Sequence, residues 1–407
     1  MKTALTARYG LIHGTYWMAY AAISGYVSLY LLELGFSSGA IGALIAAAGL
    51  ASALLQPTVA GLADRERGPS LKAINLVVAA LTAACGGGLL LFRENKVAAL
   101  CFYAGALALL QLQTPLVNGL GVTSINCGEK LNYGVSKSTS SVTFALASFG
   151  LGRITARLGG RPVPWAITAF SLLFLGSLCL YPTERAPRRE METAGAQGVA
   201  FFKKYPRFTG VLLGCILIYI SHVLLNSFTL QIIRAKGGDS SHMGLAMALA
   251  ALSELPTMLC FTKMLRWKDS GFWMKLTGFF FLIKILGSWL APNVTVYYLF
   301  QLTQVLAWAL IAIASVYYIN AVMEPEDAVK GQAYYTMTYT LASVLGSLIG
   351  GPMIDAFGIG PTLAFGTVCA AVGTAIVLRF AQETVDKGIY KDAHLQKRAG
   401  TRPNEAS

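Results

Sequence analysis

The sequence predicts an all-α polytopic membrane protein with twelve transmembrane helices arranged as two six-helix bundles. Its composition, the length of its apolar blocks and one central polar linker support this prediction. Of the 407 residues, 55% are apolar and only 13% are charged, well below the charged share of a soluble domain. The apolar residues come in blocks of about 20, which span a ~30 Å hydrocarbon core as helices. Lipid requires backbone groups to pair within their own segment, which excludes isolated strands.

The apolar blocks divide into two groups of six around a polar, basic segment. This division is typical of transporters built from two repeats. We expect an N-terminal bundle at 1–182, a cytoplasmic linker at 183–208, a C-terminal bundle at 209–382 and a disordered cytoplasmic tail at 383–407. The expected spans are 10–32, 39–62, 72–92, 97–122, 134–157, 163–182, 209–231, 244–264, 272–291, 295–321, 332–355 and 360–381.

The net charge of +13 predicts the orientation of the chain. Lys and Arg gather in alternate loops: after the second span, in the linker, after the eighth span and in the tail. The positive-inside rule then places both termini and the linker in the cytoplasm, as in a bacterial inner membrane. Because topology accounts for the basic residues, we expect no nucleic-acid partner. The seven cysteines form no CxxC pair and predict no metal site.

Ionisable residues inside the spans are the main functional signal, because a charge in the bilayer core is costly. His222, Glu254 and Lys284 lie near the middle of the seventh, eighth and ninth spans. Asn226 follows His222 by one turn on the same helix face. We predict that these groups line a polar cavity between the bundles. In the alternative interpretation Glu254 and Lys284 only neutralise each other, and His222 makes a structural hydrogen bond.

The first bundle offers polar and aromatic partners for this cavity. Asn118, near the end of the fourth span, and Lys137, near the start of the fifth, should lie at similar depth because these helices are antiparallel. Phe144 lies two turns beyond Lys137 on the same face, and Tyr26 supplies an aromatic ring from the first span. Such groups can hydrogen-bond a polar solute and stack on it.

Two further features concern helix geometry. Pro57, Pro115 and Pro256 should interrupt the second, fourth and eighth spans, and Pro256, just after Glu254, should loosen its span beside an ionisable group. Arg153 and Arg157 lie one turn apart near the outer end of the fifth span. We expect their side chains to snorkel towards the membrane interface.

Local strings resemble a known family. The chain is similar to the major facilitator superfamily, and within it to the oligosaccharide:proton symporters typified by lactose permease. A cytoplasmic signature of the superfamily is kept in part as AGLADRERG, with Asp64 and Arg65 in place as a conformational motif. The strings that carry the resemblance include GYVSLYLLELGFSSGAIG (25–42), PLVN (115–118), YGVSKSTSSVTFALAS (133–148), MGLAMALAALSELP (243–256), LIKILGS (282–288) and GGPMIDAFG (350–358).

The resemblance implies roles for individual residues. Lys137 stands at the family's sugar-binding Arg, Phe144 at its stacking Trp, and Asn118 at a sugar-binding Glu. Glu254 matches an essential Glu that contacts sugar and takes part in proton coupling. Lys284 matches an Arg of the ninth helix.

The chain also departs from the family. The His/Glu proton pair of the tenth helix corresponds to Gln304 and Ala307, and His222 replaces an Asp of the seventh helix. We retain Gln304 as a candidate substrate contact. Candidates for proton coupling are Glu254, Lys284 and His222.

These observations predict a monomeric secondary active transporter of a polar solute, most simply a sugar, oligosaccharide or related metabolite. The proton is the candidate coupling ion, and we expect no other cofactor. An uncoupled facilitator remains an alternative, favoured by Gln304 and Ala307. A drug or metabolite exporter is a further alternative, although the fifth span lacks the Gly-Pro motif of antiporters. An enzyme is not expected, because the four histidines are dispersed and no nucleophile–base set is present.

Overall fold

The structure is a computed structural model that describes residues 2–64, 68–127, 129, 131–182 and 198–384. These residues are mostly helical and contain no strand. Within them, ten helices are long and apolar enough to cross a membrane. The all-α polytopic fold is therefore confirmed, whereas the count of twelve stays a prediction, because the helical stretches at 2–33 and 133–158 are not among the ten. The predicted tail lies outside the described residues from 385 onwards, and the predicted linker lies outside them between 183 and 197.

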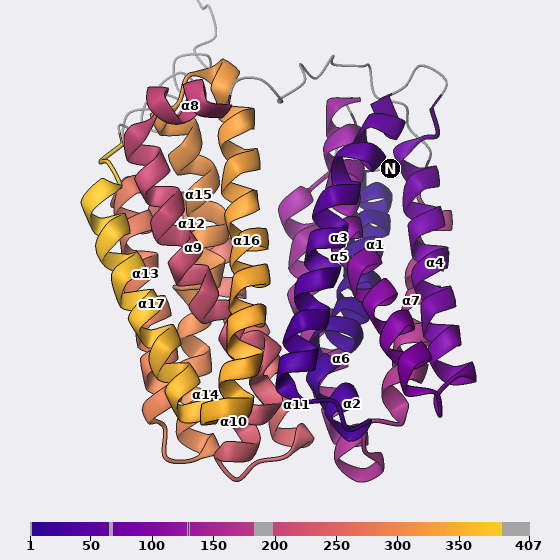
Figure 1. Ribbon diagram of the computed structural model, residues 1–407. Helices are drawn as coiled ribbons and strands as arrows, with labels where there is room; N and C mark the ends of the chain where they lie inside the picture. The colour runs from indigo at the N-terminus through magenta and orange to yellow at the C-terminus, as the bar shows by residue number, and fades with distance from the viewer. Residues whose placement is uncertain (1, 65–67, 128, 130, 183–197, 385–407) are drawn as a thin grey trace, which may run out of the picture.

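The helices before residue 182 form one bundle (Figure 1). Within it α1 packs against α5, α6 and α7, and α4 packs between α5 and α7. Polar caps start several helices: Asn95 and Asn132 each accept a backbone N–H at the beginning of α5 and α6. The elements are α1 (Lys2–Tyr20), a π-helix η1 (Ala21–Gly25), α2 (Val27–Glu33), α3 (Ser38–Asp64), α4 (Leu71–Leu91), α5 (Lys96–Asn126), α6 (Tyr133–Leu158) and α7 (Pro162–Cys179).

The helices after residue 198 form the second bundle (Figure 1). Its first helix, α8, falls within the predicted linker. Phe201 of α8 is buried against Phe208 and Tyr334, so this amphipathic turn docks on the bundle. The elements are α8 (Gly198–Lys204), α9 (Pro206–Ser227), α10 (Thr229–Ala235), α11 (Ser240–Ser253), α12 (Leu255–Met264), α13 (Ser270–Leu290), α14 (Val294–Gln301), a 3-10 helix η2 (Leu302–Val305), α15 (Trp308–Val322), α16 (Pro325–Phe357) and α17 (Ile359–Phe380).

Several predicted spans are interrupted within the membrane. The eighth span is interrupted at Glu254, beside Pro256: α11 ends at the residue before Glu254 and α12 begins at the residue after it, although Glu254 keeps helical dihedral angles. The interruptions predicted at Pro57 and Pro115 are absent, because α3 and α5 continue through these prolines. The tenth span narrows into the 3-10 helix η2 between α14 and α15. Irregular backbone at membrane depth is tolerated only where protein or a cavity surrounds it. Here the Thr257 hydroxyl donates to the Val305 carbonyl at 2.6 Å, which joins the two interruptions.

The two bundles touch at one end of the molecule. There α3 packs on α16 and α6 packs on α11. Glycines permit the close approach: a Cβ added at Gly244 would lie 2.4 Å from the Ser148 carbonyl oxygen. The Asp355 carboxylate of α16 accepts the backbone N–H groups of Ser38 and Gly39, at 2.9 and 2.6 Å, and so caps α3 across the interface.

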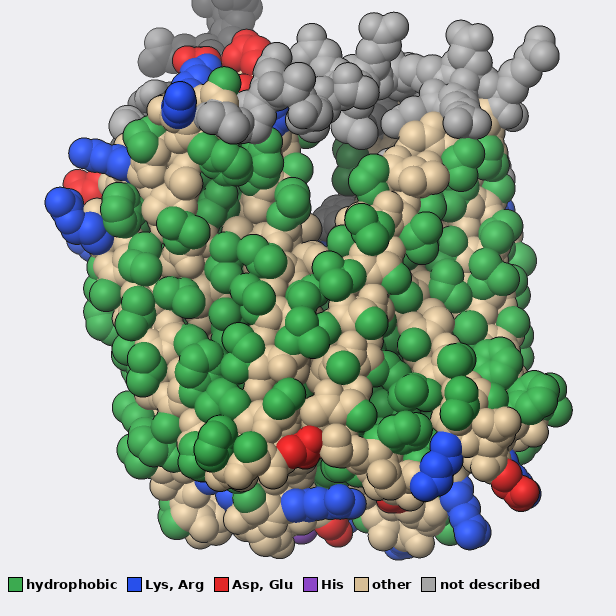
Figure 2. All heavy atoms as spheres, in the orientation of Figure 1, with side chains coloured by type: hydrophobic (Ala, Val, Ile, Leu, Met, Phe, Trp, Pro, Cys, Tyr) green, Lys and Arg blue, Asp and Glu red, His purple; other side chains and the backbone are tan. Residues whose placement is uncertain are grey.

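At the opposite end, which carries the N-terminus and α8, the bundles separate. Figure 2 shows the hollow between them on this side. The structure is therefore V-shaped, closed at one end and open at the other.

A side chain at Gly244 should weaken the closed end. In Gly244→Leu the new side chain would overlap the Ser148 carbonyl, and such overpacking costs about 1–3 kcal/mol. This shifts an equilibrium between closed and separated forms about fivefold or more. We expect faster hydrogen exchange in the first turns of α11 and α3, measured by mass spectrometry.

The matched control is Gly150→Leu on α6, where an added Cβ meets nothing within 4 Å. It should exchange like the unmodified protein. Equal exchange in Gly244→Leu and the control would contradict the assignment of Gly244 to a tight closure.

Candidate functional site

A chain of hydrogen bonds links three spans inside the second bundle. Lys284 of α13 donates from Nζ to Oε1 of Gln304 in η2. Gln304 in turn donates from Nε2 to Oε1 of Glu254 at 3.0 Å. Lys284 and Gln304 are almost fully buried. The two ionisable residues predicted from the sequence are therefore brought together, with the amide of Gln304 standing between their charges.

The first bundle contributes a second cation to this group. Lys137 lies on α6, which contacts α12 next to the interruption at Glu254. The charges of Lys137 and Lys284 both act on Glu254. The carboxylate of Glu254 is thus within electrostatic range of one ammonium group from each bundle. That these groups line a solute cavity between the bundles stays a prediction.

His222 and Asn226 form a second polar group beside the first. The His222 ring stacks on Trp308, with ring centroids 4.5 Å apart and planes 8° from parallel. Its Nε2 is 2.8 Å from Nδ2 of Asn226. Its buried Nδ1 has no hydrogen-bond partner among the described residues. The charge of Lys284 also acts on His222, so the two groups are electrostatically connected.

Aromatic side chains near the site were partly missed by the sequence analysis. Phe144, which was predicted, packs edge-on to Trp17 with centroids 6.0 Å apart. Trp17 itself stands 4.7 Å from the ring of Tyr20. Trp17 and Trp308 had escaped notice, although a Trp deep in a span rather than at its ends is a usable signal, since Trp prefers the membrane interface.

Two predicted residues lie elsewhere or have other described contacts. Tyr26 is fully buried at the closed end, where its hydroxyl donates to the Ser148 carbonyl at 2.6 Å. Asn118 is half-buried on α5, and its backbone carbonyl oxygen accepts a hydrogen bond from the Tyr9 hydroxyl at 3.4 Å. Solute binding by Tyr26 and Asn118 stays a prediction.

The predicted cytoplasmic motif falls at the edge of the described chain. Asp64 is the last residue of α3, and its side chain is not described; Arg65 lies outside the described residues. In the described part of the chain, no group of three or more His, Cys, Asp or Glu could hold a metal ion.

Comparisons with known proteins agree with this architecture. The model of the MFS_1 like family matches residues 9–365. A maltose permease of Geobacillus stearothermophilus is 25% identical over 399 residues, covering 94% of this chain and 95% of the relative.

Solved structures show the same fold at low identity. The nucleoside transporter NupG superposes with a TM-score of 0.75 at 14% identity, over 92% of this chain and 98% of that one. A D-xylose-proton symporter superposes with a TM-score of 0.67 at 16% identity, over 95% and 99%. The protein is thus a multi-pass membrane transporter rather than an enzyme, with a small-molecule substrate and a lipid environment. Its chain belongs to the MFS_1 like family of major facilitator transporters.

Proposed function

We propose that the protein transports a sugar-like polar solute by alternating access and binds it between Lys137 and Glu254. The observation that carries this proposal is the buried hydrogen-bond chain from Lys284 through Gln304 to Glu254. Beside it α12 contacts α6, the helix of the other bundle that carries Lys137. The solutes for which three similar transporters are named support this solute class. Maltose, D-xylose and nucleosides all carry a polyhydroxylated ring.

The chemistry of the site suits such a ring. A carboxylate accepts hydrogen bonds from hydroxyl groups, and an ammonium group donates to them. Glu254 keeps acceptor capacity beyond the bond from Gln304. Trp17 and Phe144 offer apolar ring faces on which the C–H face of a sugar can stack.

Binding at this position explains how transport would follow. A solute that touches both bundles makes its full set of contacts only when the open end closes around it. Its differential affinity for that state would then shift the conformational equilibrium. In this proposal the open face is the cytoplasmic one, in a bacterial inner membrane with both termini inside, and the functional unit is the monomer.

We further infer that the proton is the coupling ion, that Glu254 carries it, and that no other cofactor is needed. The Gln304 amide does not titrate, so it can hold Glu254 in place in both protonation states. The carboxylate of Glu254 attracts both Lys284 and Lys137. Its protonation would remove this negative charge, so that the site would alternate between two charge states. His222 is the second candidate carrier.

An uncoupled facilitator is the competing function. It is favoured by Gln304 and Ala307, because neither side chain can titrate at the positions where the resemblance implies a proton pair. The two functions differ in whether a pH gradient drives accumulation.

Solute counterflow in proteoliposomes tests the substrate class. The panel contains radiolabelled maltose, D-xylose, a nucleoside and a cationic drug. We expect exchange of at least one ring-bearing polyol and none of the drug. Counterflow of the drug alone would overturn the sugar-like assignment in favour of an exporter.

Replacing Lys137 should weaken binding of the transported solute. Lys137→Gln removes a charged hydrogen-bond donor, which is worth about 1.5–3 kcal/mol, so affinity should fall about 10- to 150-fold. The measurement is solute binding to purified protein by isothermal titration calorimetry. Lys263→Gln, which changes an exposed lysine on α12, should bind normally. Unchanged affinity in Lys137→Gln would remove Lys137 from the site.

Replacing Glu254 separates coupling from exchange. Glu254→Gln keeps a polar side chain of the same size but cannot bind and release a proton. We expect loss of uptake driven by an imposed pH gradient, acidic on the side from which solute enters, while counterflow continues. Gradient-driven accumulation at the level of the unmodified protein would refute the proton role. Absence of any such accumulation in the unmodified protein would favour the facilitator.

A further inference from the structure

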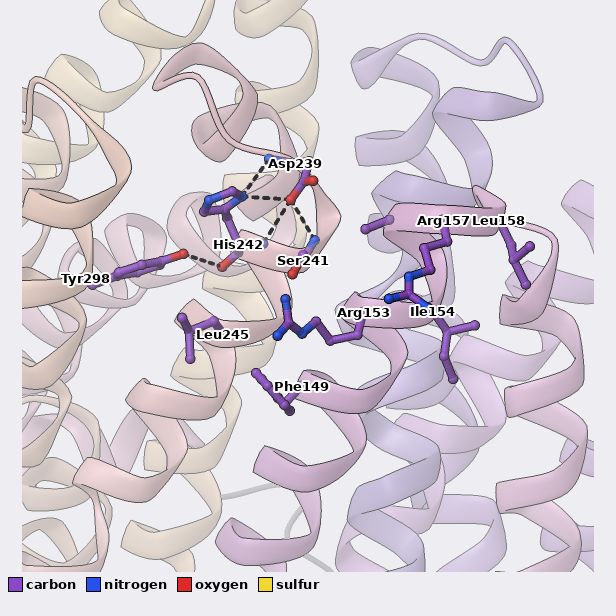
Figure 3. A pocket seen from close by; sticks show the side chains of 11 residues that line it. Phe149, Arg153, Ile154, Arg157, Leu158, Asp239, Ser241, His242, Leu245 and Tyr298 are labelled. Carbon is purple, nitrogen blue, oxygen red and sulfur yellow. Dashed lines mark hydrogen bonds and ion pairs between the residues drawn. The ribbon is translucent and has the colours of Figure 1, made fainter.

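A pocket separate from the central site lies at the closed end of the molecule. It has a volume of about 860 Å³, within the range of small-molecule sites. One wall belongs to α6 of the first bundle, and the other belongs to α11 and α14 of the second. Figure 3 shows Arg153 and Arg157 projecting from α6, with Arg153 directed towards Leu245 and Ser241 of α11.

The α6 wall changes from apolar to cationic along one stripe. Phe149, Arg153 and Arg157 follow one another at intervals of four residues and so share a helix face. The Arg153 guanidinium lies 5.5 Å from the centre of the Phe149 ring. Phe149 is 40% exposed, and Leu158 at the end of the helix is 60% exposed. The cations therefore stand near the membrane interface, with exposed apolar surface beside them.

The two arginines contact no acidic side chain among the described residues. Neither makes a hydrogen bond or ion pair with another residue in the part of the chain that the structure describes. The acid in the pocket, Asp239, is already engaged. Its carboxylate accepts the N–H groups of Ser241 and His242 and lies 2.7 Å from the His242 ring.

These hydrogen bonds make Asp239 the N-terminal cap of α11, and its protonation state agrees with that role. Partial burial raises its pKa, but the hydrogen bonds from His242 and Ser241 outweigh burial and hold the pKa below its usual value. Asp239 thus remains an anion that serves the first turn of α11. The pocket keeps two guanidinium groups that an outside anion could satisfy.

We propose that this pocket binds an anionic phospholipid, with Arg153 and Arg157 holding the phosphate and the acyl chain lying against Phe149 and Leu245. Guanidinium groups bind phosphate oxygens in bidentate fashion. The apolar wall and the location at the membrane interface fit a lipid rather than a free anion. Because both bundles line the pocket, the bound lipid holds α6 against α11 and favours the closed end.

The test is native mass spectrometry of the purified transporter titrated with phosphatidylglycerol or phosphatidylcholine. We expect phosphatidylglycerol to bind more tightly. Replacing both arginines, Arg153→Gln with Arg157→Gln, should weaken its binding by about 10- to 30-fold. The control pair Arg161→Gln with Arg234→Gln removes the same charge from exposed residues outside the pocket. It should bind as the unmodified protein does.

Three results would overturn the proposal. One is equal affinity of the unmodified protein for the two lipids. Another is unchanged phosphatidylglycerol binding in the double variant. If the double variant does not fold, Arg157→Gln alone is measured, and unchanged binding in it has the same meaning. The third is displacement of phosphatidylglycerol by an equal concentration of inorganic phosphate, which would identify a free-anion site.

Discussion

The second bundle is organised around one constraint, which is that charges in a membrane interior must be satisfied within the protein. Lys284, Gln304 and Glu254 meet this requirement together, each from a different span. A direct Lys–Glu contact would neutralise the charges but leave little for a solute to bind. An intervening amide keeps both charges satisfied and leaves Glu254 with acceptor capacity.

The backbone follows the same constraint. Glu254 lies at the break between α11 and α12, and Gln304 lies in the 3-10 segment between α14 and α15. Interrupted helices expose backbone groups that need partners, and Thr257 supplies one for Val305. The helix interruptions therefore occur where the polar side chains gather. There the polar side chains can pair with the backbone groups that the interruptions leave free. This arrangement resembles the discontinuous helices by which many transporters form midplane sites.

In the proposed alternating access, the closed end is the contact between the bundles that must separate. There, backbone atoms of the two bundles approach closely at Gly152 and Gly244, and Asp355 caps a helix of the other bundle. These contacts depend on small residues and a few hydrogen bonds rather than on a large interlocked core. Such an interface can separate without unfolding either bundle. The central site, which joins Lys137 to Glu254, lies where a small rotation would change access.

The residues that the sequence could predict are those whose charge is energetically costly inside a membrane. Glu254, Lys284 and Lys137 were found because a charge in an apolar block is expensive, and Pro256 correctly predicted the break beside Glu254. Gln304 carries no charge, so its bridging role became visible only when three helices were placed together.

Other features carry no charge. Trp17 and Trp308 resemble ordinary core because each is an aromatic ring in an apolar block, and only their depth within a span marks them. The interruptions at residues 21–25 and 302–305 contain no proline that would mark them in the sequence. The π-helix η1 also changes the face of every residue after it. For this reason helical periodicity could not show towards which neighbours Tyr26 points.

The central claim is that a sugar-like solute binds across the two bundles. An experimental structure with the solute that is transported best in counterflow tests this claim most directly. The account predicts density for the solute between Lys137 of α6 and Glu254, within hydrogen-bonding distance of both. A solute that contacts only one bundle, or that lies away from the Lys284–Gln304–Glu254 chain, would contradict it.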